Sequence, residues 1–204
     1  QPLAAQIVNT DSVSCFGDTD GLAEIGATGG TSPYRYSLDG VNFQQSGIFS
    51  NLAPGAYTAT VTDAHACQST IQFTIYEPAL LTVTLAGTTD VKCFNGNDRT
   101  ATVTIAGGKP AYTATLGSQT VTTAPYTFNT LSAGTYTITA TDVNTCTATV
   151  NAVINQPTQL VLTEVSVTAT SCYGGNDGGI TVSAAGGTPQ YLYSLDFGTP
   201  QPSP

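Results

Sequence analysis

The stretch CFGDTDG at residues 15–21 returns twice further along the chain, as CFNGNDR at residues 93–99 and as CYGGNDG at residues 172–178. The leading cysteines of these stretches are 78 and 79 residues apart, and a second pair of cysteines is 79 residues apart. The two sets are Cys15, Cys93 and Cys172, and Cys67 and Cys146. A fixed period of this size sets the folding unit and favours an array of repeats over one compact domain.

The period divides the chain into two complete repeats and one truncated repeat. Repeat 1 covers residues 1–78, repeat 2 covers residues 79–157 and repeat 3 covers residues 158–204. Repeat 3 stops before the counterpart of Cys67 and Cys146 would be reached. We therefore expect the chain to be part of a longer protein and the partner of Cys172 to lie beyond this fragment.

The residues between the cysteines predict β-strands. Segments such as ATVTI at residues 101–105 alternate apolar and polar side chains, which is typical of half-buried strands. Glycine, proline, asparagine and aspartate gather between such segments, and no stretch of ten residues has the apolar stripe of a helix. The strands expected in repeat 1 are residues 4–10, 22–28, 34–38, 47–50, 56–63 and 69–76, with a further one at 41–44.

Six or seven strands in about 78 residues favour a small immunoglobulin-like β-sandwich. The motif L-x-x-G-x-Y, at residues 52–57 and 131–136, predicts a tyrosine corner in which Tyr57 and Tyr136 bond back to the preceding backbone. Paired glycines followed by proline predict a sharp connection between the second and third strands of each repeat. The expected fold is all-β, with tandem immunoglobulin-like sandwiches.

Composition excludes several classes of function. Thirteen acidic and four basic side chains give a net charge of −9, so we expect no nucleic-acid partner. No apolar run approaches the roughly 20 residues that span a bilayer, so we expect a chain that does not cross the membrane. His65 is the only histidine, and no serine lies in a nucleophile motif, so we expect no enzymatic activity.

Two cysteines in each complete repeat predict the disulfides Cys15–Cys67 and Cys93–Cys146, each closing a loop of about 53 residues. The chain-entropy estimate gives such a bond about 4 kcal/mol, which is a large contribution for a domain of this size. Disulfides would place the protein in an oxidising compartment, outside the cell or on its surface. A zinc site is the rival interpretation, but the chain has no C-x-x-C motif and too few further ligands.

The acidic loop after the first cysteine is the strongest candidate for a ligand site. Its oxygen-bearing side chains recur in a glycine-rich turn, which suits Ca²⁺, and we otherwise expect no cofactor. The alternative is a turn stabilised by the side chains themselves, because Asx residues bond to nearby backbone and tolerate left-handed conformations. The candidate calcium ligands are Asp18 and Asp20, Asn97 and Asp98, and Asn176 and Asp177.

Aromatic side chains could instead stack on sugar rings, which would indicate a glycan-binding module. The chain has no tryptophan, however, and we expect most of these rings to belong to the core or the corners. The candidates are Tyr36, Phe43, Phe49, Tyr126, Phe128 and Tyr193.

The ordered motifs C-[FY]-x-x-x-D, G-G-x-x-x-Y, L-x-x-G-x-Y and T-D-x-x-x-C together resemble the SprB repeat. The last of them is residues 62–67 and 141–146 here. The resemblance implies a segment of a large surface adhesin or filament of gliding Bacteroidetes, used for motility or attachment, exported by the type IX secretion system and held at the outer membrane.

The partners that this resemblance implies are neighbouring repeats of the same chain, surface polysaccharide, and components of the secretion system or outer membrane. Two alternatives to a structural and adhesive segment stay open. One is a module that binds a glycan or a protein, and the other is a non-catalytic spacer of a secreted enzyme.

Overall fold

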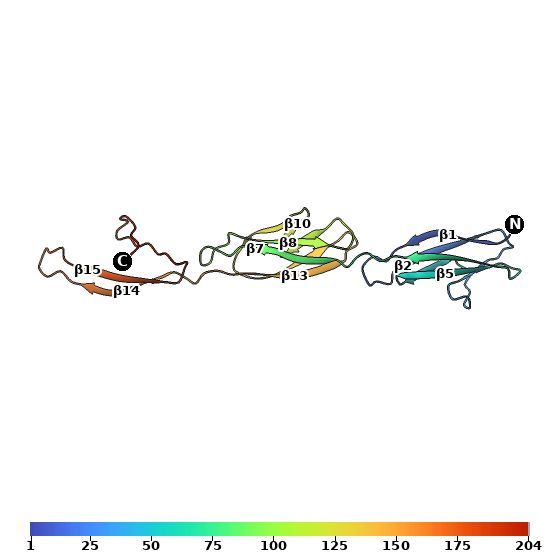
Figure 1. Ribbon diagram of the computed structural model, residues 1–204, viewed down its shortest axis with the longest axis horizontal. Coiled ribbons are helices and arrows are strands. Elements are labelled where there is room, and N and C mark those ends of the chain that lie inside the picture. Colours follow the sequence, from blue (N-terminus) through green and yellow to red (C-terminus); the bar gives the residue numbers. More distant parts are fainter. Residues whose placement is uncertain (204) are drawn as a thin grey trace. The chain divides into compact units, whose positions relative to one another are not determined.

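The computed structural model of the chain describes residues 1–203, and strands are the only regular secondary structure in that range (Figure 1). The expected all-β fold is confirmed. The strands of repeat 1 are β1 (Ala4–Asp11), β2 (Gly21–Thr28), β3 (Arg35–Ser37), β4 (Ile48–Leu52), β5 (Gly55–Thr62) and β6 (Gln68–Ile75). Those of repeat 2 are β7 (Thr82–Thr88), β8 (Arg99–Ala106), β9 (Thr113–Leu116), β10 (Gln119–Val121), β11 (Tyr126–Leu131), β12 (Gly134–Thr141) and β13 (Thr147–Ile154). Repeat 3 contributes β14 (Val161–Thr168) and β15 (Gly179–Ala185).

The chain forms two compact units. The first comprises residues 1–83, 105–114 and 139–149, and the second comprises residues 84–104, 115–138 and the chain from residue 150 onward. The first unit therefore contains all of repeat 1 together with parts of repeat 2, among them the loops that join β8 to β9 and β12 to β13.

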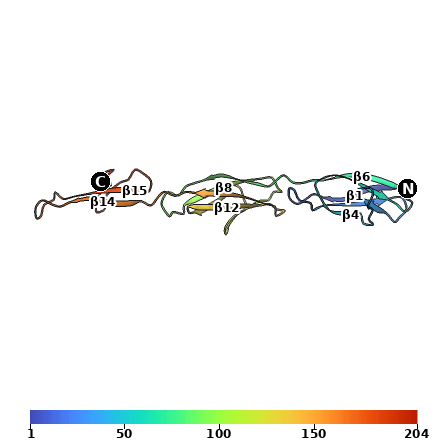
Figure 2. The same cartoon turned by 90° about the horizontal axis from the view of Figure 1, so that it is seen from below.

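Repeat 1 is a sandwich of two antiparallel sheets, which Figures 1 and 2 show as two layers of strands. One sheet has the order β1-β2-β4 and the other the order β3-β5-β6. The strands alternate in burial as their sequences predict, so that the inner faces of both sheets supply the core. That core consists of Val13, Ala23, Ile25, Leu52, Ala59, Val61, Phe73 and Ile75.

Repeat 2 has the same order of strands with one addition. Its sheets are β11-β8-β7 and β10-β9-β12-β13. The same positions are buried in both repeats, but the sizes of their side chains differ. Ala59 and Phe73 of repeat 1 correspond to Ile138 and Ala152 of repeat 2, so a small residue is replaced by a large one at the first position and the reverse at the second. Sandwich cores tolerate such exchanges when the total volume is kept.

The seventh strand predicted at residues 41–44 differs between the repeats. In repeat 1 only an isolated bridge between Tyr36 and Gln44 occurs there. In repeat 2 the corresponding segment is β10, which pairs with β9. The chain therefore reverses direction at this point in both repeats, although only one of them forms a strand.

The paired glycines adopt the left-handed backbone that the sequence predicts. Gly29 and Gly30 have φ of 67° and 61°, and Gly107 and Gly108 have φ of 74° and 56°. A Cβ on Gly29 or Gly107 would overlap the carbonyl oxygen of Pro2 or Leu80. Glycine is therefore required both by backbone conformation and by the close approach of the segment that precedes β1 or β7.

One further left-handed position generates a prediction. Asn51 and Thr130 occupy equivalent exposed sites near the ends of β4 and β11, with φ of 58° and 60°. Asparagine tolerates this conformation, whereas it costs a β-branched residue roughly 1 kcal/mol. Thr130→Asn should raise the free energy of unfolding by about 0.5–1 kcal/mol, and the reciprocal Asn51→Thr should lower it similarly in urea denaturation. Shifts of the same sign in both variants would contradict this explanation.

Candidate functional site

The hairpin between β5 and β6 is held by a buried carboxylate. Asp63 is only 7% exposed. Its Oδ1 accepts hydrogen bonds from the amides of His65 and Cys67, both at 2.9 Å, and its Oδ2 accepts one from the amide of Thr31 at 3.0 Å. The aspartate of T-D-x-x-x-C thus joins this hairpin to the double-glycine loop.

The hairpin between β12 and β13 repeats the arrangement. Oδ1 of Asp142 accepts from the amides of Asn144 and Cys146 at 2.9 and 3.0 Å, and Oδ2 accepts from the amide of Lys109 at 2.8 Å. A Cβ on Gly108 would lie 2.6 Å from this Oδ2, so the second glycine also makes room for the carboxylate. The second cysteine of each complete repeat is positioned by these bonds.

The electrostatics of Asp63 follow from its hydrogen bonds. Burial raises the pKa of this carboxyl, but the amides of Thr31, Cys67 and His65 lower it by more. The pKa of Asp63 therefore lies below its ordinary value, because three donors stabilise the charged form.

The loop after the first cysteine is held by a second aspartate. Oδ1 of Asp20 accepts from the amide of Ser14 at 2.9 Å, and Oδ1 of Asp177 accepts from the amide of Ser171 at 3.0 Å. Hydrogen bonds from these serines, side chain first and then backbone, lower the pKa of Asp20 and Asp177. In repeat 2 the equivalent Asp98 instead pairs with Arg99, with 3.3 Å between Oδ1 and Nε.

The calcium candidates lie on these loops and form no dense ligand cluster. Among residues 1–203, no group of three or more histidine, cysteine, aspartate or glutamate side chains could hold a metal ion. The carboxylates of Asp20 and Asp177 close their own loops, while Asp18, Asn97 and Asn176 are exposed in the same turns. The bonds favour the turn interpretation, and calcium binding stays a prediction.

The linker between repeats is bonded to the same loop. Oε2 of Glu77, the residue before Pro78, accepts from the amide of Gly17 at 3.1 Å. At the next linker, Oε1 of Gln156 accepts from the amide of Asn95 at 2.9 Å. An acceptor before the linker proline therefore fixes the loop after the first cysteine in both complete repeats.

The disulfide joins two different repeats. Cys15 is bonded to Cys146, with 5.7 Å between their Cα atoms and a sequence separation of 131 residues. Cys67, Cys93 and Cys172 are free and exposed. The predicted bonds Cys15–Cys67 and Cys93–Cys146 are therefore wrong.

The physical reason is that the cysteines of one repeat lie at opposite ends of its sandwich. The amide of Val13, near Cys15, donates to the carbonyl of Tyr76, which follows the end of β6. Cys67 directly precedes the start of β6, and the eight residues of this strand span about 25 Å. A disulfide needs Cα atoms within about 7 Å, so Cys15 and Cys67 cannot meet in the folded repeat.

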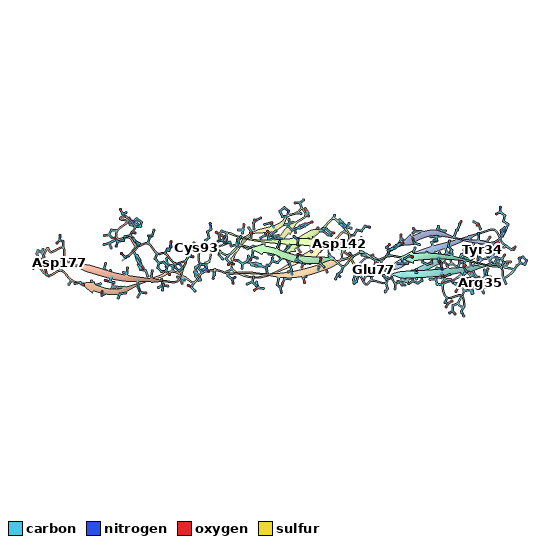
Figure 3. The ribbon with its side chains drawn as sticks, in the orientation of Figure 1. Tyr34, Arg35, Glu77, Cys93, Asp142 and Asp177 are labelled. Carbon is cyan, nitrogen blue, oxygen red and sulfur yellow. A yellow bond between two sulfur atoms is a disulfide. The ribbon has the colours of Figure 1, made fainter. Side chains whose placement is uncertain are left out.

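Polar contacts surround the bond. The side-chain amide of Asn144 donates to the carbonyl of Ser14 at 2.8 Å, next to the disulfide. A hollow between these loops is lined in part by Tyr76, Glu77, Lys109 and Asn144. Glu77 and Asp142, labelled in Figure 3, belong to the two sides of this junction. We call this set of contacts around Cys15–Cys146 the junction.

The tyrosines and other aromatics have structural places. The hydroxyls of Tyr57 and Tyr136 donate to the carbonyls of Ala53 and Ser132 at 2.9 and 3.0 Å, which is the bond that a tyrosine corner requires. Phe128 is fully buried, and Tyr36 and Phe49 pack against the core of repeat 1. Phe43, Tyr126 and Tyr193 are half-buried.

Several residues of the junction escaped the sequence analysis. Glu77 and Asn144 carry no distinctive motif, although the position before each linker proline and the second position after each T-D pair recur at the repeat period. The aromatic residue after each first cysteine was also missed as a surface feature. Phe16, Phe94 and Tyr173 are all exposed.

Comparison with protein families gives one result. The SprB repeat matches residues 7–43, 85–116 and 165–200, which together make up just over half of the chain. None of the curated proteins compared with the chain matches it. The described residues contain no helix long and apolar enough to cross a membrane.

Several solved structures resemble the chain in fold. The fibronectin(III)-like modules of Clostridium thermocellum CbhA are 14% identical, with a TM-score of 0.33, covering 74% of this chain and 94% of theirs. A C-terminal intimin fragment, in complex with the intimin-binding domain of its translocated receptor, is 13% identical with a TM-score of 0.41, covering 83% and 71%. Eight immunoglobulin domains of the Down syndrome cell adhesion molecule are 12% identical with a TM-score of 0.44, covering 93% and 28%. At these scores the likeness implies nothing about ligands.

The disulfide generates the first prediction for the junction. Bonding residues 131 apart removes chain entropy worth about 5 kcal/mol from the unfolded state. Cys146→Ser should therefore lower the free energy of unfolding by up to about 5 kcal/mol under oxidising conditions. The matched control Cys67→Ser removes an exposed free thiol and should change it by less than about 0.5 kcal/mol. Equal losses in the two variants would support bonding within the repeat instead.

The lowered pKa of Asp63 leads to a prediction about the pH dependence of stability. Its folded value lies below the unfolded value of about 3.9, so the unfolded chain binds more protons as the pH falls through that range. The stabilisation is complete above about pH 5 and is lost on further acidification. Urea denaturation between pH 7 and pH 2 should show this fall, and Asp63→Asn should make the profile flatter. An unchanged slope in Asp63→Asn would show that this carboxylate is not responsible.

Proposed function

Because the chain belongs to the SprB repeat family, we propose that it is a structural and adhesive segment of a large filament or adhesin on a bacterial surface. The coarser description, an extracellular structural module of adhesion type, follows from the family and the disulfide. The proposal adds a role in gliding motility or surface attachment, export through the type IX secretion system, and attachment to the outer membrane of a member of the Bacteroidetes.

The junction is the observation that carries this proposal. A covalent bond, Cys15–Cys146, ties two successive repeats whose linker is already short and contains Pro78. The side chain of the linker residue Glu77 accepts a hydrogen bond from the loop that follows Cys15. The side-chain amide of Asn144 donates a hydrogen bond to the carbonyl of Ser14, the residue before Cys15. Such a linker loses most of its freedom, because proline restricts its own φ and the residue before it. A segment that must transmit position or force along a chain benefits from joints of this kind.

Surface charge is consistent with an exported, soluble array. The chain carries a net charge of −9 on few charged residues, and like charges keep such chains apart in solution. The proposal assigns the segment no catalytic role.

A binding module is the second candidate, and one observation favours it. The aromatic residue after the first cysteine is exposed in every repeat, as Phe16, Phe94 and Tyr173. Exposed rings repeated along an array could stack on sugars or pack on a protein partner. Replacing Phe16 and Phe94 by serine would abolish binding to a polysaccharide or protein surface in this case, whereas a purely structural segment would show no binding to lose.

The proposal is tested on cells that produce the full protein. Antibodies raised against residues 1–204 should label intact cells, and the label should disappear from the surface, but not from permeabilised cells, when type IX export is inactivated. Deleting residues 1–156 in frame should reduce attachment to a solid surface without abolishing export. Labelling only after permeabilisation in wild-type cells, or unchanged attachment of the deletion strain, would overturn the assignment.

A further inference from the structure

The five cysteines occupy two recurring local environments. Cys67 and Cys146 lie on the T-D-x-x-x-C hairpin, while Cys15, Cys93 and Cys172 begin the loop with the acidic turn. The one disulfide within residues 1–203 joins an acidic-turn cysteine of one repeat to the hairpin cysteine of the next. The three free cysteines can form the same kind of bond only if their surroundings match those of Cys15 and Cys146.

The hairpin of Cys67 matches that of bonded Cys146. In both, the cysteine amide donates to an aspartate Oδ1, at 2.9 Å for Asp63 and 3.0 Å for Asp142. The residue before each cysteine has a left-handed backbone, with φ of 61° at Ala66 and 70° at Thr145. The backbone at Cys67 therefore has the same conformation as at Cys146, but the thiol of Cys67 is free and exposed.

The loop of Cys93 matches that of bonded Cys15 in its bonds to the end of the repeat and to the linker, although Asp98 pairs with Arg99 where Asp20 accepts from Ser14. The amide of Val91 donates to the carbonyl of Asn155 at 3.0 Å, as the amide of Val13 does to the carbonyl of Tyr76 at 3.1 Å. The linker acceptor bonds the loop in both cases, through Gln156 and Glu77. The loop of Cys172 keeps the bond between Asp177 and Ser171 that corresponds to Asp20 and Ser14.

We infer that Cys15–Cys146 is one member of a series of disulfides, each joining the first cysteine of a repeat to the second cysteine of the following repeat. Cys67 is then the half-site for the first cysteine of a repeat that precedes residue 1. Cys93 is the half-site for the hairpin cysteine of a complete repeat that follows residue 157, and Cys172 is the half-site for the repeat after that.

Side chains at the hairpin extend the inference. His65 occupies the position of Asn144, whose amide donates to the carbonyl of Ser14 across the junction. An imidazole N–H can donate in the same way. The partner of the Cys67 hairpin is therefore an acidic-turn loop of another repeat, whose carbonyl before the cysteine would accept from His65.

The bond forms by oxidation. Two thiols lose two protons and two electrons to give one disulfide, and a disulfide oxidant such as glutathione disulfide accepts them and becomes two thiols. Exposure of Cys67 and Cys93 gives such an oxidant access to both.

Two lengthened chains test the series, each keeping the full chain. In the first, a second copy of residues 78–156 is inserted between Gln156 and Pro157, so that a complete repeat follows Cys93. In the second, a copy of residues 1–76 precedes Gln1, so that an acidic-turn cysteine precedes Cys67. The added copy carries a conservative substitution next to each of its cysteines, so that its cysteine peptides differ in mass from the original ones. Each chain is oxidised with a glutathione redox buffer, alkylated and mapped by mass spectrometry of non-reduced peptides.

The first chain should contain Cys15–Cys146 and a bond from Cys93 to the inserted counterpart of Cys146. The second should contain Cys15–Cys146 and a bond from the added counterpart of Cys15 to Cys67. In both, the two added cysteines should leave the number of free thiols the same as in the original chain. Cys93→Ser in the first chain is the control, and it should release the inserted hairpin cysteine as a thiol.

Pairing within a repeat, or a free thiol at Cys93 of the first chain when Cys15–Cys146 has formed, would overturn the inference. Formation of Cys15–Cys146 reports folding of the original junction in each chain, and its loss identifies a chain in which that junction has not folded. The second chain tests the series of disulfides independently, through the bond expected at Cys67. Neither result depends on adhesion or export, so the proposed surface function can fail while this bonding holds, or the reverse.

Discussion

Each complete repeat depends on one buried carboxylate at the end of its sandwich. Asp63 and Asp142 each accept three backbone amides, two from the hairpin that carries the second cysteine and one from the double-glycine loop. Without this acceptor those amides would lose their partners beside a buried position, which is costly. The same contacts explain why the second residue of the double-glycine loop has no room for a side chain, and why the orientation of the hairpin cysteine is fixed. The covalent link between repeats therefore rests on a hydrogen-bonding arrangement inside each repeat.

Much of the fold could be predicted because it depends on local patterns. Alternation of apolar and polar side chains located the strands to within a few residues, and the tyrosine corner and double-glycine loop have short motifs tied to one geometry. The calcium candidates illustrate a weaker case. The sequence places Asp20 and Asp177 in turns, but it does not indicate that their oxygens accept hydrogen bonds from the amides of Ser14 and Ser171.

The disulfide pairing could not be predicted because it depends on the number of chain reversals between the cysteines. The uncertain strand at residues 41–44 decides that number. If it is left out, Cys15 and Cys67 fall at the same end of the sandwich. If it is counted, they fall at opposite ends, as in the structure, where Gln44 bridges Tyr36 and β10 forms in repeat 2. A short segment with marginal strand character thus determines whether the bonds lie inside repeats or between them.

The bond Cys15–Cys146 also changes what a protease can do to the chain. Hydrolysis of any single peptide bond between these residues opens a ring and leaves the two pieces covalently attached. In a series of such bonds the rings overlap, since Cys93 lies inside the ring that Cys146 closes. Every peptide bond of the array would then belong to at least one ring. A chain so built could be cut once between the second cysteine of each repeat and the first cysteine of the next, and it would still remain one molecule until its disulfides were reduced.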